Sequence, residues 1–469
     1  MKSVVLAGLC LAFEASAAPQ LVLHLDMKAA AWRREALSRM LKDAKADGYD
    51  AILWEVEDKV RWESCPEVAH PEAMDKTEFR KVLDEARGLG LEPIPLLQTV
   101  GHAEYVLARE KYRGFREKPD NRTCYCVSKP EVGAFLRRYL AEMLDLFGPE
   151  VKQFHLGGDE ARVFATCPVC SKRDKGRLYA EHLEGLAALL RARGVRPACW
   201  CDMLLRDLGK GGAGLLPTDW SIWHWDYSIG VSEMPVTEWT SRLPELLERG
   251  YKVMFCCATQ CYGDGPFLVD WNLHARNVAA SAEMVRTNRL EGLCVTSWSV
   301  RGAPKSVQRP LFSYAAKCLR QPGGDKARLW ADCRGSFFGR DADALAELGV
   351  YDVKFLQFDV RDWRRHFDPS VPDVPPVRPT RELADRIRAH RARLAAARER
   401  VKDDAGLPLV AQVLRGAALT DAWLKALEDY QDGKSFGFSE MEAAKWYSDE
   451  EETPKSAVVS ARMLGGFAP

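Results

Sequence analysis

The chain has 469 residues, of which 47% are hydrophobic, so it is long enough and apolar enough to bury a large core. Lysine plus arginine and aspartate plus glutamate both number 67, which gives a net charge of zero. The sequence therefore lacks the positive excess by which proteins attract nucleic acid or anionic membranes, and we expect neither as a partner. The 14 tryptophans suit a protein that binds sugars, although tryptophan also fills cores.

The first residues have the pattern of a signal peptide. Lys2 precedes a short apolar run at residues 4–13, and small residues at 15–17 form a cleavage pattern. The run is too short to cross a bilayer, which takes about 20 apolar residues. The alternative is a buried first strand. We expect residues 1–18 to be removed and the protein to be exported, to the periplasm or outside the cell, with no later segment that spans a membrane.

From residue 21 onward, short apolar runs alternate with longer segments of helical periodicity. The apolar runs cover residues 21–25, 51–55, 93–97, 152–156, 196–200, 220–223, 252–257 and 292–296. Helical segments follow at residues 32–46, 76–89, 130–147, 175–193, weakly after the fifth run, 236–249, 273–288 and 304–319. Eight such units predict an α/β fold, a (β/α)₈ TIM barrel over residues 19–322. A doubly wound sheet would use the same local pattern, but no G-x-G-x-x-G motif follows the first strand.

Residues 323–469 are predicted to form a mainly helical C-terminal extension packed on the barrel. The proline-rich stretch at 369–379 predicts a linker or a surface loop. Residues 381–402 and 409–430 have helical periodicity, and the first of these helices is rich in arginine. It also carries an apolar stripe at helical spacing, so we expect it to pack on the barrel rather than to bind an anionic partner.

Catalytic side chains of a barrel lie at the C-terminal ends of its strands, and the fourth apolar run ends in a notable pattern. His155 and Leu156 are followed by two glycines and then by Asp159 and Glu160. Neighbouring residues of a regular strand point to opposite faces, but glycines permit a turn that would bring both acids to one pocket. The alternative is a helix N-terminus, where acidic residues are favoured by the helix dipole.

Other predicted strands also end in polar and aromatic side chains. These residues are Asp26, Lys28, Glu57, Asp58, His102, Glu104, Trp200, Asp202, Trp223, Trp225, Tyr262, Asp264, Trp298 and Arg301. Any single tryptophan is more often part of a core than of a ligand site. Several of them at successive strand ends favour a sugar-binding pocket at this end of the barrel.

The segment at residues 154–160 resembles the H-x-G-G-D-E signature of glycoside hydrolase family 20, the β-N-acetylhexosaminidases. Residues 24–28 (HLDMK), 54–58 (WEVED), 94–102 (IPLLQTVGH) and 200–203 (WCDM) resemble the hexosaminidase D-like branch in particular. The similarity spans residues 20–320 in the same order. As in that branch, the barrel begins without the additional α/β domain that other members carry before it.

The resemblance implies a retaining, exo-acting β-N-acetylhexosaminidase that releases terminal GlcNAc or GalNAc from glycans, with no metal or organic cofactor. In this family the 2-acetamido oxygen of the substrate is the nucleophile. Glu160 would be the general acid and base, and Asp159 would orient the acetamido group and stabilise the oxazolinium intermediate. Neighbouring carboxyls disfavour each other's ionisation, so we expect the pKa of Glu160 to be raised while Asp159 stays ionised.

The resemblance also assigns the residues around the acids. His102 matches the histidine after the third strand, with Asp58 as a candidate partner in the proton network. Tyr262 would hydrogen-bond the acetamido carbonyl and Asp264 a sugar hydroxyl. The remaining substrate contacts would come from the aromatic walls and from the first strand, namely Trp200, Trp225, Trp298, Asp26 and Lys28. Classical members bind the outer hydroxyls of the sugar with an arginine on the first strand, and here Lys28 stands nearby instead, so the preference between gluco and galacto sugars is left open.

Two cysteine pairs form a second candidate site. Cys124 and Cys126 follow the third strand, and Cys167 and Cys170 follow the fourth, so both loops would lie at the same face. Four thiolates could hold a structural Zn²⁺, two disulfides would suit an exported protein, and unrelated free thiols are the third alternative.

Two alternatives to the acetamido-dependent enzyme remain open. One is a glycosidase on the same scaffold that does not depend on the acetamido group. The other is a catalytically silent glycan-binding protein, against which the retained Asp159 and Glu160 argue. The natural glycan and the oligomeric state are also left open.

Overall fold

The computed structural model describes residues 18–28, 30–209, 211–232, 237, 239–261, 264–298, 303–350, 380–401, 407–453 and 457. The predicted signal peptide up to residue 17, the proline-rich stretch at 369–379, Tyr262 and Arg301 lie outside these ranges. No helix within them is both long enough and apolar enough to cross a membrane.

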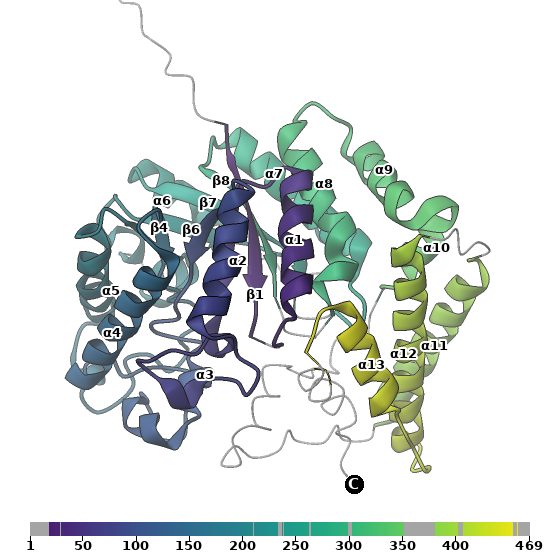
Figure 1. The fold of residues 1–469 in the computed structure, drawn as a ribbon, viewed down its shortest axis with the longest axis horizontal. Coiled ribbons are helices and arrows are strands. Elements are labelled where there is room, and N and C mark those ends of the chain that lie inside the picture. The colour runs from purple at the N-terminus through teal and green to yellow at the C-terminus, as the bar shows by residue number, and fades with distance from the viewer. Residues whose placement is uncertain are drawn as a thin grey trace, which may run out of the picture.

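Within these ranges, eight parallel strands form one sheet, and helices surround it (Figure 1). The strands are Gln20–Asp26 (β1), Ala51–Glu55 (β2), Glu92–Pro95 (β3), Gln153–His155 (β4), Arg196–Trp200 (β5), Ser221–Trp225 (β6), Lys252–Gln260 (β7) and Gly292–Ser297 (β8). The ladders run in the order β3-β2-β1-β8-β7-β6-β5-β4. A parallel bridge between Leu96 and His155, with Leu97 N donating to His155 O at 2.9 Å, joins the two ends. The predicted (β/α)₈ barrel is confirmed.

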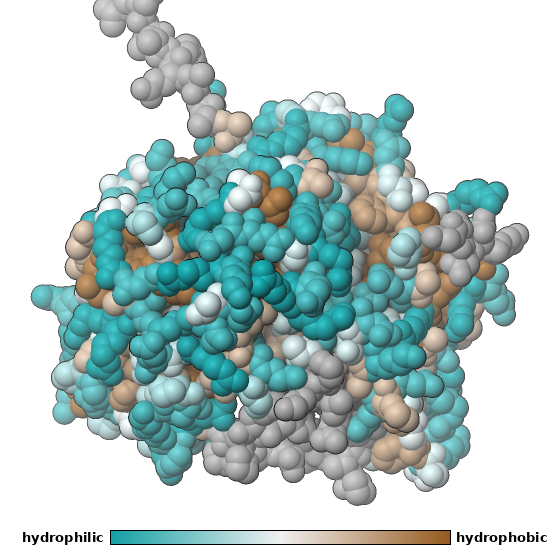
Figure 2. Space-filling view, viewed as in Figure 1, coloured by the Kyte–Doolittle hydropathy of each residue, from teal (hydrophilic) through white to brown (hydrophobic). Residues whose placement is uncertain are grey.

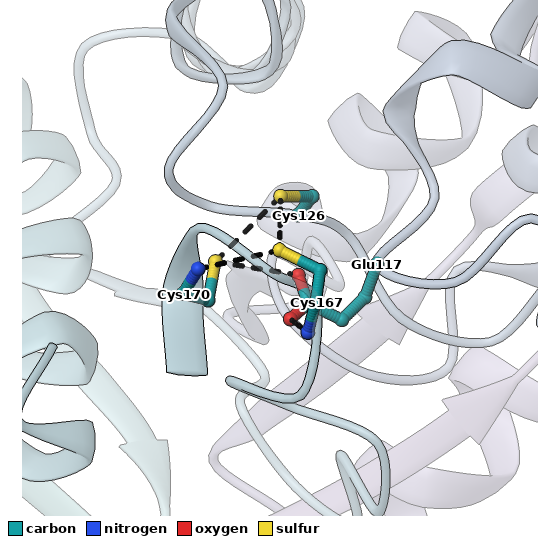
Figure 3. Close-up of side chains that lie close together, drawn as sticks. All are labelled: Glu117, Cys126, Cys167 and Cys170. Atoms are coloured by element: carbon teal, nitrogen blue, oxygen red, sulfur yellow. Dashed lines mark hydrogen bonds between the residues drawn. The ribbon is translucent and has the colours of Figure 1, made fainter. Parts of the chain in front are cut away.

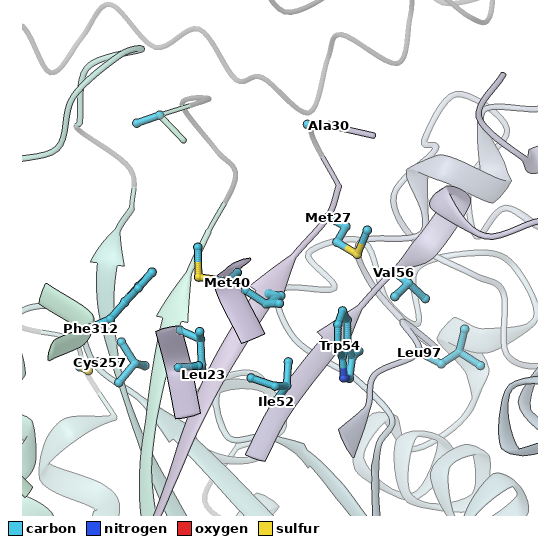
Figure 4. Close-up of a cluster of buried hydrophobic side chains, with 14 of the residues drawn as sticks. Leu23, Met27, Ala30, Met40, Ile52, Trp54, Val56, Leu97, Cys257 and Phe312 are labelled. Carbon is cyan, nitrogen blue, oxygen red and sulfur yellow. The ribbon is translucent and has the colours of Figure 1, made fainter. Parts of the chain in front are cut away.

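Each strand is buried on both of its faces, which explains the continuous apolar runs in the sequence. In β1, Leu21, Leu23 and Leu25 belong to the layer between sheet and helices, whereas Val22 lies in the barrel interior. Figure 4 shows Leu23 and other side chains of this outer layer beside Phe312. The interior cluster contains Trp200 and Trp223, whose large side chains fill the barrel below the site.

The helices around the barrel match most of the predicted segments. They are Arg34–Asp47 (α1), Lys76–Gly88 (α2), Pro130–Phe147 (α4), Lys175–Arg191 (α5), Leu243–Glu248 (α6), Trp271–Thr287 (α7) and Arg309–Arg320 (α8). Capping residues fix several starts, because Asp75, Asp174 and Asp270 each accept a hydrogen bond from a first-turn amide. A short π-helix, Met203–Asp207 (η5), follows β5 in place of an α-helix. Hydrophilic side chains cover the outer face of α1 and α2 (Figure 2).

The C-terminal region is helical and packs on the barrel, as predicted. Its helices are Lys326–Phe338 (α9), Ala342–Glu347 (α10), Arg381–Glu399 (α11), Pro408–Gln431 (α12) and Glu440–Glu450 (α13). The Tyr447 hydroxyl donates to the carbonyl of Pro266 at 3.1 Å, and Trp446 packs edge-on against Phe267 with ring centroids 5.4 Å apart. Helix α13 was not predicted, because the final residues have only weak helical periodicity. The contacts of Tyr447 and Trp446 with the barrel hold it in place.

Candidate active site

A sharp turn follows β4 and carries the two adjacent acids. Gly157 and Gly158 have φ angles of +64° and +89°, and Glu160 has a φ of +42°. A Cβ at Gly157 would lie 2.2 Å from Gln98 Oε1, and one at Gly158 would lie 2.5 Å from the Tyr179 hydroxyl oxygen. Both positions therefore require glycine for conformation and for space. The left-handed backbone of Glu160 costs on the order of 1–3 kcal/mol and persists because the surrounding contacts hold it.

The two carboxylates converge on His102, which follows β3. His102 Nε2 lies 3.3 Å from Asp159 Oδ2 and 3.5 Å from Glu160 Oε2. The loops approach closely here, because a Cβ at Gly101 would lie 2.3 Å from the carbonyl oxygen of Asp159. Burial alone would lower the pKa of His102, but the charges of Asp159 and Glu160 outweigh it and raise that pKa well above its usual value.

The two acids differ in exposure and in partners. Asp159 is 5% exposed, whereas the side chain of Glu160 is 29% exposed and its Oε1 lies 3.1 Å from Arg162 Nη2. Within the part of the chain that the structure describes, no donor reaches Asp159 Oδ1. Asp159 therefore offers a buried oxygen that can accept a hydrogen bond from a ligand. The carboxyl group of Glu160 beside it is within reach of solvent.

Asp202, immediately after β5, connects the acid pair to the aromatic residues. It is fully buried, and its Oδ2 accepts from the backbone N–H of Glu160 at 2.9 Å. Its Oδ1 accepts from Trp225 Nε1 at 3.3 Å. Burial and the nearby charge of Asp159 raise the pKa of Asp202 to about 7. We had not predicted a role for Asp202, although its place at a strand end was visible in the sequence.

The predicted tryptophans pack together but differ in how deeply they are buried. Trp225 and Trp298 are partly buried, whereas Trp200 is fully buried in the barrel interior. Trp200 and Trp298 pack with ring centroids 5.7 Å apart, and Trp298 Nε1 donates to the Tyr227 hydroxyl at 2.7 Å. Trp225 stacks on Tyr227 with centroids 5.2 Å apart. Tyr227, which sequence reasoning missed, therefore links the two partly exposed tryptophans.

Asp26 and Lys28 belong to a buried charge network at the ends of β1 and β2. Lys28 Nζ lies 2.5 Å from Glu55 Oε1 and 3.5 Å from Asp26 Oδ1. His24 Nε2 lies 3.0 Å from Glu55 Oε2, and Lys28 Nζ lies 5.0 Å from the centre of a Trp298 ring. Burial disfavours the charge on Lys28, but Asp26 and Glu55 outweigh it and raise its pKa. Glu55 was not predicted as a site residue.

Two predicted residues have other close partners. Asp58 forms an ion pair with Lys59, so its partnership with His102 stays a prediction. Asp264 is buried, and its carboxylate accepts from the backbone N–H of Cys261 at 2.8 Å and lies 2.9 Å from His274 Nε2. In this conformation Asp264 holds its own loop, and its contact with sugar stays a prediction.

The structure corrects the predicted set of four cysteines. Cys126, Cys167 and Cys170 come together, but the fourth side chain of the group is that of Glu117. The thiol of Cys124 lies 3.5 Å from the carbonyl oxygen of Tyr125 and is not part of the group. All thirteen cysteines that the structure describes are free. The spacing of the cysteines correctly predicted which two loops meet. It does not define the direction in which each side chain points.

Comparison with known proteins identifies the class. Residues 60–332 match the profile of the family described as glycosyl hydrolase family 20, catalytic domain. This match covers more than half of the chain, and the chain therefore belongs to glycosyl hydrolase family 20.

The curated relatives carry one name. Hexosaminidase D from Bos taurus is 30% identical over 196 residues, which is 40% of this chain and 56% of the relative. Hexosaminidase D from Homo sapiens is 26% identical over 296 residues, 59% of either chain. The matched part thus spans less than two thirds of the length of these relatives.

Solved structures share the fold. The family 20 exo-β-N-acetylglucosaminidase from Vibrio harveyi in complex with N-acetylglucosamine is 16% identical with a TM-score of 0.52, covering 70% of this chain and 58% of that one. The chitobiase from Flavobacterium johnsoniae is 15% identical with a TM-score of 0.51, covering 95% of this chain and 78% of that one.

The glycine turn gives a direct test of how the acid pair is held. Gly158→Ala should lower the free energy of unfolding by about 1–3 kcal/mol, because the added Cβ meets Tyr179 and the φ angle disfavours alanine. Gly185→Ala is the matched control, because Gly185 is exposed in α5 and a Cβ there has no neighbour within 4 Å. Chemical denaturation measures both. Equal stability of the two variants would contradict the conclusion that position 158 requires glycine.

The charge on His102 predicts a pH-dependent contribution to stability. Its pKa is raised in the folded state, so its ion pairs stabilise the fold fully below about pH 6.5 and lose this effect as the pH rises through the folded-state pKa. The difference in unfolding free energy between the wild type and His102→Asn should therefore shrink above about pH 6.5. Denaturant titrations from acid to alkaline pH would measure it. A difference that is constant with pH would contradict the ion pairs.

Proposed function

We propose that the protein is a retaining, exo-acting β-N-acetylhexosaminidase that releases terminal GlcNAc or GalNAc from glycans by substrate-assisted catalysis. The observation that carries the proposal is the convergence of Asp159 and Glu160 on His102 at the end of β4 in a family 20 domain. The names of the relatives support the substrate class, since both curated proteins are called Hexosaminidase D.

In the first step, the acetamido oxygen of the substrate bonds to the anomeric carbon while the glycosidic C–O bond breaks. Glu160 gives its proton to the departing oxygen, and its partial exposure suits a group that must reach the linkage. Asp159 Oδ1 accepts the acetamido N–H, which makes the carbonyl oxygen a better nucleophile. The charge of Asp159 then stabilises the oxazolinium ring.

In the second step, Glu160 acts as the base. It removes a proton from water as the water oxygen attacks the anomeric carbon, and the ring C–O bond of the oxazolinium breaks. Two displacements at the same carbon give net retention of configuration. Asp202 is a positioning residue here, because it accepts from the N–H of Glu160 and from Trp225 and so fixes the acid relative to the aromatic wall.

The aromatic side chains would form the walls of the sugar site. Trp225 and Trp298 are only partly buried, and Tyr227 contacts both, so their faces are suited to pack on a pyranose ring. Trp200 lies beneath Trp298 as support. Asp26 and Lys28, beside Trp298, would bind the outer hydroxyls of the sugar.

Hydrolysis of aryl glycosides tests the assignment and its alternatives. We expect turnover of the N-acetyl-β-glucosaminide or the N-acetyl-β-galactosaminide and none of the plain β-galactoside. Glu160→Gln should lower kcat/KM by about 10²- to 10⁴-fold, and Asp159→Asn by about 10²- to 10³-fold. Glu63→Gln, at a carboxylate that is 82% exposed, is the matched control and should leave the rate unchanged.

Two results would exclude the proposed function. Comparable hydrolysis of the plain galactoside would favour a glycosidase that does not depend on the acetamido group. Unchanged turnover in folded Glu160→Gln would remove that residue from its role, and inactivity of the wild type towards all three glycosides would favour a glycan-binding protein.

We also propose that residues 1–18 direct export and are removed. The basis is Lys2, the apolar run at residues 4–13 and the small residues at 15–17. The intact mass of the protein recovered from its native source should correspond to a chain that begins near residue 19. A mass that includes the first 18 residues would contradict processing at this site.

A further inference from the structure

Three thiols and one carboxylate, from the segments that follow β3 and β4, lie together (Figure 3). The ligand atoms of Glu117, Cys126, Cys167 and Cys170 are all within 4.8 Å of one another. Cys126 Sγ lies 3.6 Å from both Cys167 Sγ and Cys170 Sγ, and Glu117 Oε2 lies 3.5 Å from Cys170 Sγ.

These separations match the edges of a tetrahedron around a zinc ion. With a Zn–S bond of about 2.3 Å and a Zn–O bond of about 2.0 Å, the sulfur–sulfur edge is about 3.8 Å and the sulfur–oxygen edge about 3.5 Å. A disulfide has its sulfurs only about 2.05 Å apart. The spacing of Cys126 from both of its neighbours is therefore that of ligands around a common centre rather than that of a bonded pair.

Two separate pieces of backbone present these side chains. Residues 115–117 pair with residues 124–126, since Cys126 N donates to Phe115 O at 2.8 Å and Glu117 N donates to Cys124 O at 2.9 Å. In the second piece, Cys170 N donates to Cys167 Sγ at 3.3 Å across the two intervening residues. A backbone N–H aimed at sulfur stabilises the thiolate form that binds metal.

The carboxylate of Glu117 is held by the backbone through one oxygen and turns the other oxygen towards the thiols. Its Oε1 accepts from the backbone N–H groups of Thr166 and Cys167, both at 2.8 Å, and its Oε2 faces Cys170. Ser128 Oγ lies 3.1 Å from Cys170 Sγ. Such contacts orient the side chains that bind the ion in metal sites. Glu117 was not predicted, because it lies nine positions before Cys126 and outside any cysteine motif.

We propose that Glu117, Cys126, Cys167 and Cys170 bind one Zn²⁺ in a closed, structural site. Three sulfurs and one oxygen in tetrahedral array suit zinc, and four protein ligands leave no position for a catalytic water. A cation at the centre would also compensate the mutual repulsion of these anionic groups. A cavity of about 700 Å³, lined by Glu117, Cys126 and Cys167 among others, offers the ion a route.

The site would join the two loops that carry His102, Asp159 and Glu160. Tyr125 N donates to Val100 O and Ala103 N donates to Thr123 O, both at 3.0 Å, so the arm with Cys126 is tied to the loop of His102. Cys167 and Cys170 lie on the loop that begins with Asp159 and Glu160. Zinc would therefore fix the spacing between the histidine and the acids without touching the substrate.

Metal content tests the proposal and does not depend on glycosidase activity. The full-length protein, purified under reducing conditions without chelator and dialysed against metal-free buffer, should contain about one zinc per chain by mass spectrometry. Cys167→Ser and Cys170→Ser should lose it. Cys124→Ser is the matched control, because Cys124 is a buried neighbour in the same loop but outside the group, and it should retain the metal.

A second variant and a spectroscopic readout cover the case in which a cysteine variant fails to fold. Glu117→Gln keeps the shape of the side chain and should release zinc to a chelator at least about tenfold faster than the wild type. Wild-type protein loaded with Co²⁺ should show the visible absorption of a tetrahedral thiolate site.

Three outcomes would overturn the zinc site. The first is wild-type protein that holds no zinc and takes up neither Zn²⁺ nor Co²⁺ on titration. The second is equal loss of zinc from Cys124→Ser and Cys167→Ser. The third is a disulfide between any two of Cys126, Cys167 and Cys170, found by peptide mapping under non-reducing conditions of the protein from its native source.

Discussion

The contact of His102 with both Asp159 and Glu160 is the constraint on which the site depends. Adjacent side chains of an extended chain diverge, and these converge because Gly157 and Gly158 turn the backbone left-handed and Glu160 follows them. The two acids differ in their surroundings: Asp159 is buried, with an oxygen that no donor of the described residues reaches, and Glu160 is partly exposed.

The barrel supplies the rest of the site from neighbouring strand ends. Asp202 after β5 binds the N–H of Glu160 and the indole of Trp225, and Glu55 in β2 holds Lys28 beside Trp298. These bonds join strands that are far apart in sequence, so each side chain is fixed by a partner on another loop. Side chains that are fixed in this way can stay in place for a reaction without help from the substrate.

The sequence predicted the strands and helices whose formation depends on the local pattern of apolar and polar residues. All eight strands were found from their apolar runs because they are buried on both faces, and α4 was predicted with its observed bounds because Pro130 starts it and its apolar face is regular. The sequence did not reveal α13, which tertiary contacts stabilise, nor Glu117 and Glu55, whose partners lie on other segments of the chain. Cys124 was wrongly included because spacing does not define side-chain direction.

A crystal structure with a thiazoline analogue of the proposed oxazolinium intermediate tests most directly whether both acids act on one sugar site. We expect the ring nitrogen of the bound thiazoline to lie within hydrogen-bonding distance of Asp159, with the carboxyl of Glu160 at the anomeric carbon and the sugar between Trp225 and Trp298. An analogue bound elsewhere, or one that neither acid contacts, would contradict this expectation.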